Sequence, residues 1–188
     1  MMNTDLKQRI ETMRAKLDER APVVEVSAAS QLFVTPEPAC VRLVTLAEVK
    51  NTDYILEPSA GTGAILRAIK HAAPAARCDA VELNGALVGH LRGAFPGVNV
   101  WCGDFMEYEQ AVQYDKIIMN PPFSHAQDIR HIQRALSLLK PDGLLTAICL
   151  NGPRQQKNLK PLCDVWEELP CGTFSYTDVA TAIIRLRA

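Results

Sequence analysis

Two short stretches carry the residues that could do chemistry, and each follows an apolar run typical of a buried strand. The first runs from Glu57 through a small-residue turn to Gly63, and the second is Asn-Pro-Pro-Phe at 120–123. Glycines let a backbone turn tightly against a ligand, and the acid before them suits a cation better than a pyrophosphate. In an open α/β sheet, ligands bind at the carboxyl ends of the strands. We therefore expect both stretches to face one crevice.

The Asn-Pro-Pro-Phe stretch suits the binding and activation of a planar aromatic amine as a nucleophile. Such an amine is a poor nucleophile, because its lone pair is delocalised into the ring. The Asn120 side-chain oxygen and the Pro121 carbonyl can accept its hydrogens and free the lone pair, and the two prolines hold these acceptors in place. Phe123 offers a face on which a flipped base can stack. A proline-rich turn is the structural alternative, but the position after a buried fourth strand favours the functional interpretation.

Two further acids stand at the ends of the next two predicted strands. Glu82 lies about twenty residues after the glycine turn, where a carboxylate can accept the hydroxyls of a ribose. Asp104 can accept from an adenine amine, and Phe105 can flank the ring. The alternatives are a solvated acid for Glu82, a turn former for Asp104 and a core aromatic for Phe105.

Strands and helices alternate from position 53 onward. The patterns predict strands at 54–57, 78–83, 98–102, 114–120 and 144–150, and helices at 63–71, 86–95, 126–139 and 157–168. Two last strands, at 169–174 and 181–186, have no helix between them and should pair antiparallel. This alternation predicts a Rossmann-like α/β fold with a seven-stranded, mostly parallel sheet, helices on both faces and an antiparallel strand pair at the C-terminus.

Length and composition indicate one folded domain. The chain has 188 residues, 48% of them hydrophobic and 22% charged, with a formal net charge of -1. No CxxC pair occurs among the six cysteines, which favours buried reduced thiols over a metal site or secretion. No apolar run reaches membrane-spanning length. We expect an N-terminal helix and connector over 1–30, a single domain over 31–188, no metal, no membrane contact and a cytoplasmic location.

On these residues the chain resembles the class I S-adenosylmethionine-dependent methyltransferases, and among them the adenine-N6 DNA methyltransferases. The resemblance implies that the glycine turn holds the methionine part of S-adenosylmethionine, Glu82 the ribose and Asp104 the adenine. Phe33-Val34-Thr35-Pro36 is similar to a segment that lies beside the cofactor in that group. The implied cofactor residues are Phe33, Thr35, Pro36, Glu57, Pro58, Ser59, Ala60, Gly61, Gly63, Glu82, Leu83, Asp104, Phe105 and Asn120. The implied catalytic residues are Asn120, Pro121, Pro122 and Phe123, and the implied reaction is direct methylation of the adenine N6 amine in DNA.

Local signals add three expectations. Thr35 can cap a helix whose first residue is Pro36. Positions 124–160 hold six basic and two acidic residues, so Arg154 and Lys157 are candidate phosphate contacts, although a solvated turn explains them equally well. His125, beside the tetrad, can touch substrate, with a surface turn as the simpler interpretation.

The chain has no room for a separate target-recognition domain, so a specificity partner or a homodimer can supply recognition. Other acceptors remain open: an RNA base or a protein glutamine. Phe123 in place of tyrosine favours nucleic acid over glutamine. A non-catalytic cofactor-binding subunit is the third alternative, and the intact Asn120 and glycine turn argue against it.

Overall fold

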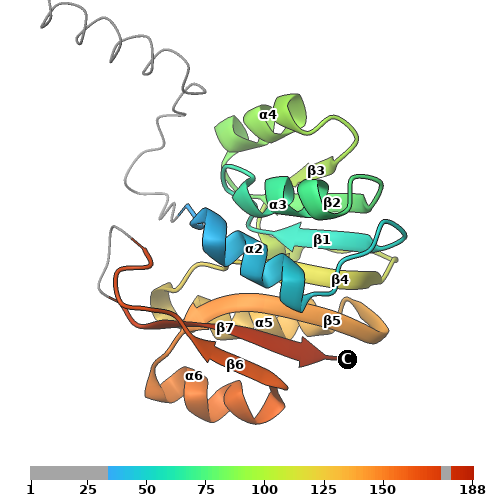
Figure 1. Cartoon of the computed structure of the whole chain (residues 1–188). Helices are drawn as coiled ribbons and strands as arrows, with labels where there is room; N and C mark the ends of the chain where they lie inside the picture. Colours follow the sequence, from blue (N-terminus) through green and yellow to red (C-terminus); the bar gives the residue numbers. More distant parts are fainter. Residues whose placement is uncertain (1–33, 175–178) are drawn as a thin grey trace, which may run out of the picture.

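A seven-stranded sheet forms the middle of the computed structural model, which describes residues 34–174 and 179–188. Its strands lie in the order β3-β2-β1-β4-β5-β7-β6, as Figure 1 shows. β1 to β5 are parallel, and β7 runs antiparallel to both β5 and β6. The predicted fold class is confirmed. The strands are β1 (Tyr54–Pro58), β2 (Arg77–Glu82), β3 (Asn99–Cys102), β4 (Tyr114–Met119), β5 (Leu139–Leu150), β6 (Val165–Glu168) and β7 (Thr181–Arg187).

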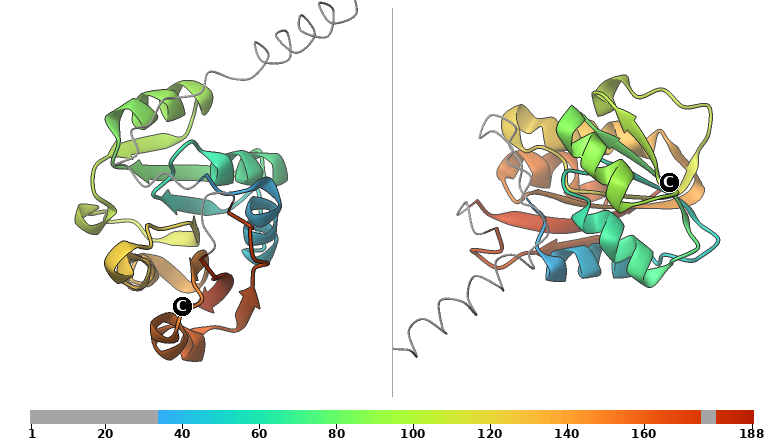
Figure 2. Two further views of the ribbon diagram at one scale, coloured as in Figure 1. Left: turned by 90° about the vertical axis from the view of Figure 1, so that its left-hand side faces the viewer. Right: turned by 90° about the horizontal axis from the view of Figure 1, so that it is seen from above.

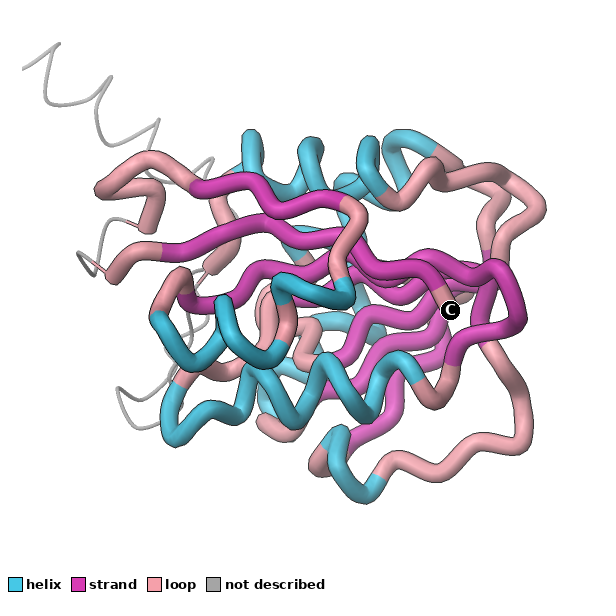
Figure 3. Tube along the Cα trace, turned by 90° about the horizontal axis from the view of Figure 1, so that it is seen from below, coloured by secondary structure: helices cyan, strands magenta, loops and turns pink. Residues whose placement is uncertain are grey.

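Helices cover both faces of this sheet, as the views in Figures 2 and 3 show. On one face the core contains α2 (Glu37–Leu46), α3 (Ala64–Ala72) and α4 (Gly85–Ala94). On the other it contains α5 (Gln127–Leu136) and the short helical turn η2 (Phe105–Glu107). Neighbouring strand residues divide between the two cores: Ile55 packs with the first and Leu56 with the second. This explains why the central strands are apolar throughout rather than alternating.

The start of α2 differs from the predicted cap. The N-cap is Pro36, and no side chain caps the helix; the proline inside the first turn is Pro38. Thr35 lies one residue before the cap, and its hydroxyl accepts a hydrogen bond from the side chain of Asn120. The helix therefore begins with two prolines and no hydroxyl cap, which leaves Thr35 available to the site.

The C-terminal third differs most from the sequence prediction. The expected helix over 157–168 is replaced by α6 (Pro153–Asn158), the turn η4 (Lys160–Leu162) and strand β6, and residues 169–174 form no strand. Pro161 interrupts the helix, since proline has no N–H to donate. Val165 then pairs with Arg185 of β7, and Trp166 with Ile184. The antiparallel pair at the C-terminus is real, but its first strand lies earlier in the chain than predicted.

Two expectations fall outside the described residues: the N-terminal helix within 1–30 and the position of Phe33. Within the described ranges, no helix is long and apolar enough to cross a membrane. The same ranges contain no group of three His, Cys, Asp or Glu side chains placed to hold a metal ion.

Candidate active site

The turn after β1 is shaped by residues with left-handed backbone conformations. Ser59, Gly61 and Gly63 all have positive φ, at 65°, 55° and 77°. At Gly63 a Cβ would lie 2.4 Å from the Phe95 ring, so only glycine fits between α3 and α4. Gly63 thus shapes the turn and packs against α4. It is not among the residues that line the cavity described below, although it was predicted to bind the cofactor.

Glu57 lies at the end of β1 beneath this turn and is 2% exposed. Its Oε2 atom has no hydrogen-bond partner within residues 34–174 and 179–188. Burial raises the pKa of the Glu57 carboxyl well above its usual range. A backbone hydrogen bond from Leu66 and the Arg67 charge oppose this rise, and the nearby Glu82 charge adds to it. A buried carboxyl with one unpaired oxygen favours a cationic or hydrogen-donating ligand.

Glu82 ties the glycine turn to the start of α4. Its Oε2 accepts from the backbone N–H of Gly61 at 2.7 Å, and its Oε1 accepts from the N–H of Asn84 at 2.8 Å. Each carboxylate oxygen can accept a second hydrogen bond, so the pair remains able to receive two hydroxyls. Beside it Leu83 is 72% exposed at the cavity, a large apolar surface open to a ligand.

The turn after β3 also contributes residues to the site. Asp104 caps η2, with Oδ1 accepting from the N–H of Met106 at 2.8 Å. Phe105 is buried, packs with Tyr108 and His131, and still lines the cavity. Phe105 therefore serves the core as well as the site, so the two interpretations of this residue are compatible.

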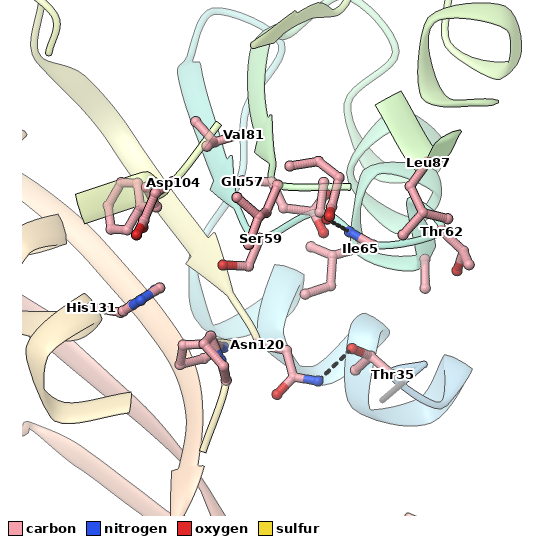
Figure 4. Close-up of a pocket in the computed structure, with 18 of the residues that line it drawn as sticks. Thr35, Glu57, Ser59, Thr62, Ile65, Val81, Leu87, Asp104, Asn120 and His131 are labelled. Carbon is pink, nitrogen blue, oxygen red and sulfur yellow. Dashed lines mark hydrogen bonds between the residues drawn. The ribbon is translucent and has the colours of Figure 1, made fainter. Parts of the chain in front are cut away.

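Asn120 follows β4 and faces the same space (Figure 4). Its Nδ2 donates to Thr35 Oγ1 at 3.0 Å, which leaves the amide oxygen on the side away from Thr35. Pro121 is buried and Pro122 partly buried, and both line the cavity. The two stretches that the sequence singled out are thus brought together by the adjacent parallel strands β1 and β4.

The cavity has a volume of about 190 Å³ and opens at the carboxyl ends of β1 to β4. Twelve of the predicted residues line it: Thr35, Glu57, Ser59, Ala60, Gly61, Glu82, Leu83, Asp104, Phe105, Asn120, Pro121 and Pro122. The sequence interpretation missed nine further lining residues: Val34, Thr62, Ala64, Ile65, Val81, Leu87, Gly103, Gln127 and His131.

The most informative of the missed residues is His131 on α5. It is 5% exposed, and its Nδ1 has no hydrogen-bond partner within the part of the chain that the structure describes. Burial lowers the pKa of this imidazole, with the Asp104 charge opposing the effect, so the neutral form is favoured. Gln127 lies four residues earlier on the same face of α5. Two polar residues at this spacing, in a helix that follows the Asn-Pro-Pro-Phe stretch, are the signal from which the sequence could have indicated both.

Besides Gly63, six of the predicted residues do not line the cavity. Phe123 packs edge-on against Phe174, with ring centroids 6.4 Å apart. His125 is exposed with φ of 53°, as expected of a surface turn. Arg154 and Lys157 are exposed on α6. Pro36 and Pro58 belong to the α2 cap and the end of β1. Their predicted roles stay predictions.

Several solved structures have the same architecture. A proposed RNA methyltransferase of Pyrococcus horikoshii superposes with a TM-score of 0.72 at 17% identity, covering 96% of this chain and 98% of that one. The modification subunit of a proposed type I restriction enzyme from Vibrio vulnificus gives a TM-score of 0.68 at 15% identity, covering 100% of this chain and 50% of that one. At these identities the likeness establishes the fold, which is the Rossmann-like methyltransferase fold.

The family follows from the sequence match. The model of the methyltransferase small domain matches residues 38–168, more than half of the chain. The chain therefore belongs to the methyltransferase small domain family. The cofactor of such a domain is S-adenosylmethionine.

Curated relatives match over a shorter stretch. The ribosomal RNA small subunit methyltransferase A of Chlorobium phaeobacteroides is 33% identical over 79 residues, which is 42% of this chain and 29% of the relative. The probable ribosomal RNA small subunit methyltransferase A of Methanopyrus kandleri is 31% identical over 90 residues, which is 46% of this chain and 32% of the relative. The chain spans about a third of the length of the curated relatives it matches.

The residues around the cavity fit S-adenosylmethionine. The buried Glu57 oxygen without a partner suits a positively charged amino acid moiety, and Glu82 suits vicinal hydroxyls. Leu83 and Phe105 supply apolar surface for a purine, and Asp104 supplies an acceptor at its edge. These acceptors follow one another along the strand ends in the order that the sequence analysis expected.

Proposed function

We propose that this chain is an N-methyltransferase that acts on the exocyclic amine of adenine in a nucleic acid. The observation that carries the proposal is the position of Asn120, whose amide stands at the end of β4 on the same cavity as Glu57 and Glu82. Acceptors for the hydrogens of an amine are useful next to a methyl donor only if the amine is the nucleophile.

S-adenosylmethionine, when bound, supplies a methyl group on positively charged sulfur that a nitrogen lone pair can attack directly. The chain provides the alignment for that attack. Glu57 and Glu82 hold the donor, and the Asn120 oxygen and Pro121 carbonyl accept the two N–H groups of the amine. This localises the lone pair on nitrogen, which would form the N–C bond as the C–S bond of the donor breaks. S-adenosylhomocysteine would leave and the nitrogen would lose one proton to solvent, so no side chain has to form a covalent bond.

RNA is the first candidate for the acceptor. The two curated relatives are named as ribosomal RNA methyltransferases, and a structural neighbour covering nearly the whole chain is described as an RNA methyltransferase. DNA is the second candidate, favoured by the resemblance of the 33–36 and 120–123 segments to adenine-N6 DNA methyltransferases and by the restriction-enzyme neighbour. The base must be unpaired or flipped to enter the cavity.

A transfer panel tests the proposal. Tritiated S-adenosylmethionine is offered with ribosomal RNA, total RNA, DNA and whole-cell protein, and labelled nucleic acid is digested for nucleoside analysis. We expect label in N6-methyladenosine, or in its deoxy form if DNA is the acceptor. Label on protein alone, or on a base other than adenine, would contradict the proposal.

Asn120→Ala is the informative variant within this panel. We expect the transfer rate to fall roughly 100-fold or more, the cost of removing one preorganised polar group at a reacting centre. Affinity for S-adenosylmethionine, measured by calorimetry, should be retained. Asn99→Ala, at an exposed position at the start of β3, is the matched control and should behave as wild type. Full activity in Asn120→Ala would show that the mechanism is wrong.

A further inference from the structure

The hydrogen bond between Asn120 and Thr35 joins two residues 85 positions apart in the chain. It is part-buried, and it is the contact drawn between these two side chains in Figure 4. A primary amide has two chemically opposite ends, a donor NH₂ and an acceptor oxygen. Only the oxygen can accept from a substrate amine. The group that binds Nδ2 therefore decides whether the amide presents its useful end.

Thr35 is well placed to fix that orientation, because it is itself held rigidly. Its side chain is 7% exposed, and its carbonyl accepts a hydrogen bond from Cys40 Sγ at 3.5 Å. Two prolines, Pro36 and Pro38, restrict the backbone that follows. The hydroxyl thus occupies a fixed position at the beginning of α2.

The helix that follows Thr35, α2, is in turn anchored to the sheet. Leu43 of α2 is fully buried, and its carbonyl accepts from Thr146 Oγ1 of β5 at 3.2 Å. Asn120 is fixed from a different direction, by β4 before it and the two prolines after it. The hydroxyl and the amide are therefore positioned by separate elements, and their 3.0 Å contact is preorganised by the fold.

We propose that Thr35 is a positioning residue for the methyl-transfer reaction: by accepting from Asn120 Nδ2, it turns the Asn120 oxygen toward the substrate amine. The inference rests on the proposed function for its catalytic consequence, and on the Thr35–Asn120 geometry for its structural part. It assigns Thr35 a role distinct from the cofactor contact that sequence resemblance implies. A cofactor contact would govern the affinity for S-adenosylmethionine, whereas a positioning residue governs the rate once both substrates are bound.

Three variants separate these roles. Thr35→Val keeps the shape and removes the hydroxyl, and Thr35→Ser keeps the hydroxyl. Thr45→Val makes the same change at an exposed position of α2, where the hydroxyl donates to the Val41 carbonyl within the helix. Melting temperatures of all three full-length proteins establish that each is folded.

The first measurement needs no acceptor. The side-chain NH₂ signals of Asn120 in a ¹H–¹⁵N spectrum are assigned by their loss in Asn120→Asp. We expect these signals to move in Thr35→Val and to stay near their wild-type positions in Thr35→Ser and Thr45→Val. Unchanged signals in Thr35→Val would overturn the structural part of the proposal.

The second measurement is the single-turnover rate of methyl transfer to single-stranded RNA and DNA oligonucleotides containing adenine, at saturating S-adenosylmethionine. In Thr35→Val we expect a fall of roughly tenfold, of the size expected from losing one neutral hydrogen bond, with unchanged cofactor affinity and rescue by Thr35→Ser. A weakened cofactor affinity with a normal rate at saturation would overturn the positioning role. If the wild-type protein labels neither oligonucleotide, the proposed function fails, and the spectrum still decides whether Thr35 orients the amide.

Discussion

The two halves of the sheet differ in what they contribute to the cavity. The carboxyl ends of strands β1 to β4 and the turns after them provide two thirds of its lining. The segment before α2 and residues of α3, α4 and α5 provide the rest. Within the described residues, none after His131 lines it, so β5, β6, β7 and α6 contribute nothing directly. The first half therefore lines the candidate cofactor site, and the second completes the sheet and carries exposed basic residues on α6.

The two halves of the sheet also differ in how far local sequence signals determine their structure. Each unit of the first half has a strand, a turn and a helix start within about twenty-five residues, with local signals such as Asn84 accepting from Ala86 and Leu87 at the start of α4. The last strands have no such signals, because β6 forms only where β7 returns beside it. Four variants test this division, in order of expected effect.

The largest effect is expected from Gly63→Ala in the first half. The substitution forces a side chain into a left-handed conformation and against Phe95, and should lower the free energy of unfolding by about 3 kcal/mol. Gly89→Ala on α4, where a Cβ meets nothing within 4 Å, should raise it by about 0.5 to 1 kcal/mol. Denaturant titration measures both. Equal effects would mean that the turn is not packed as described.

Glu57→Gln tests whether the first half is built for a cation. Because burial raises the folded pKa of Glu57 above its unfolded value, its contribution to stability is fully present at low pH and is lost as pH rises through the folded pKa. A bound cation favours the ionised form, so wild-type affinity for S-adenosylmethionine should increase with pH over the same range. The variant should bind roughly tenfold more weakly at high pH and lose this dependence.

Calorimetry across this pH range measures the effect, with unfolding curves of the free protein alongside. In its free form the glutamine variant should be more stable than wild type at high pH and similar at low pH. Glu168→Gln, at the exposed end of β6, is the control. Wild-type affinity in Glu57→Gln at every pH would show that this carboxyl does not contact the cofactor.

Arg185→Ala tests whether the second half acts on stability alone. Arg185 on β7 forms ion pairs with Asp164 at 2.8 Å and Glu48 at 3.0 Å, joining the last strands to the end of α2. Both acids are well exposed, so the loss should be about 1 kcal/mol of unfolding free energy. Cofactor affinity should not change. A clear loss of cofactor affinity would contradict the proposal that the second half of the sheet acts on stability alone.

Lys157→Gln is expected to give the smallest effect. If α6 contacts phosphates, affinity for a single-stranded oligonucleotide should fall about threefold, and the slope of affinity against salt should decrease by about one. Fluorescence anisotropy measures both. Lys50→Gln is the control and should have a weaker effect. Lys50 is exposed just before β1, at the amino ends of the parallel strands, whereas the cavity lies at their carboxyl ends. Equal effects would mean that the basic residues near α6 are only a solvated surface.

Sequence reasoning was most accurate where the signals are local. The β1 and β4 ends, the glycine turn and the acids at 57, 82 and 104 were all predicted at the cavity, since parallel strands bring their carboxyl ends to one edge. His131 and Gln127 were missed, because a helix face reveals its direction only once the helix is packed. β6 was predicted as helix, because its pairing partners lie fourteen to twenty residues away in the chain.

Sequence alone thus predicted the fold class, the methyltransferase class and the order of the candidate site residues along the strand ends. These depend on residue types and short-range spacing, which set the turns, strands and helix starts. Only the tertiary structure decided that Thr35 binds Asn120 instead of capping α2 and that Gly63 packs against α4 without lining the cavity. It also decided that one oxygen of the buried Glu57 carboxyl has no hydrogen-bond partner among the described residues. Each of these depends on which distant elements pack together, and no local pattern encodes that contact.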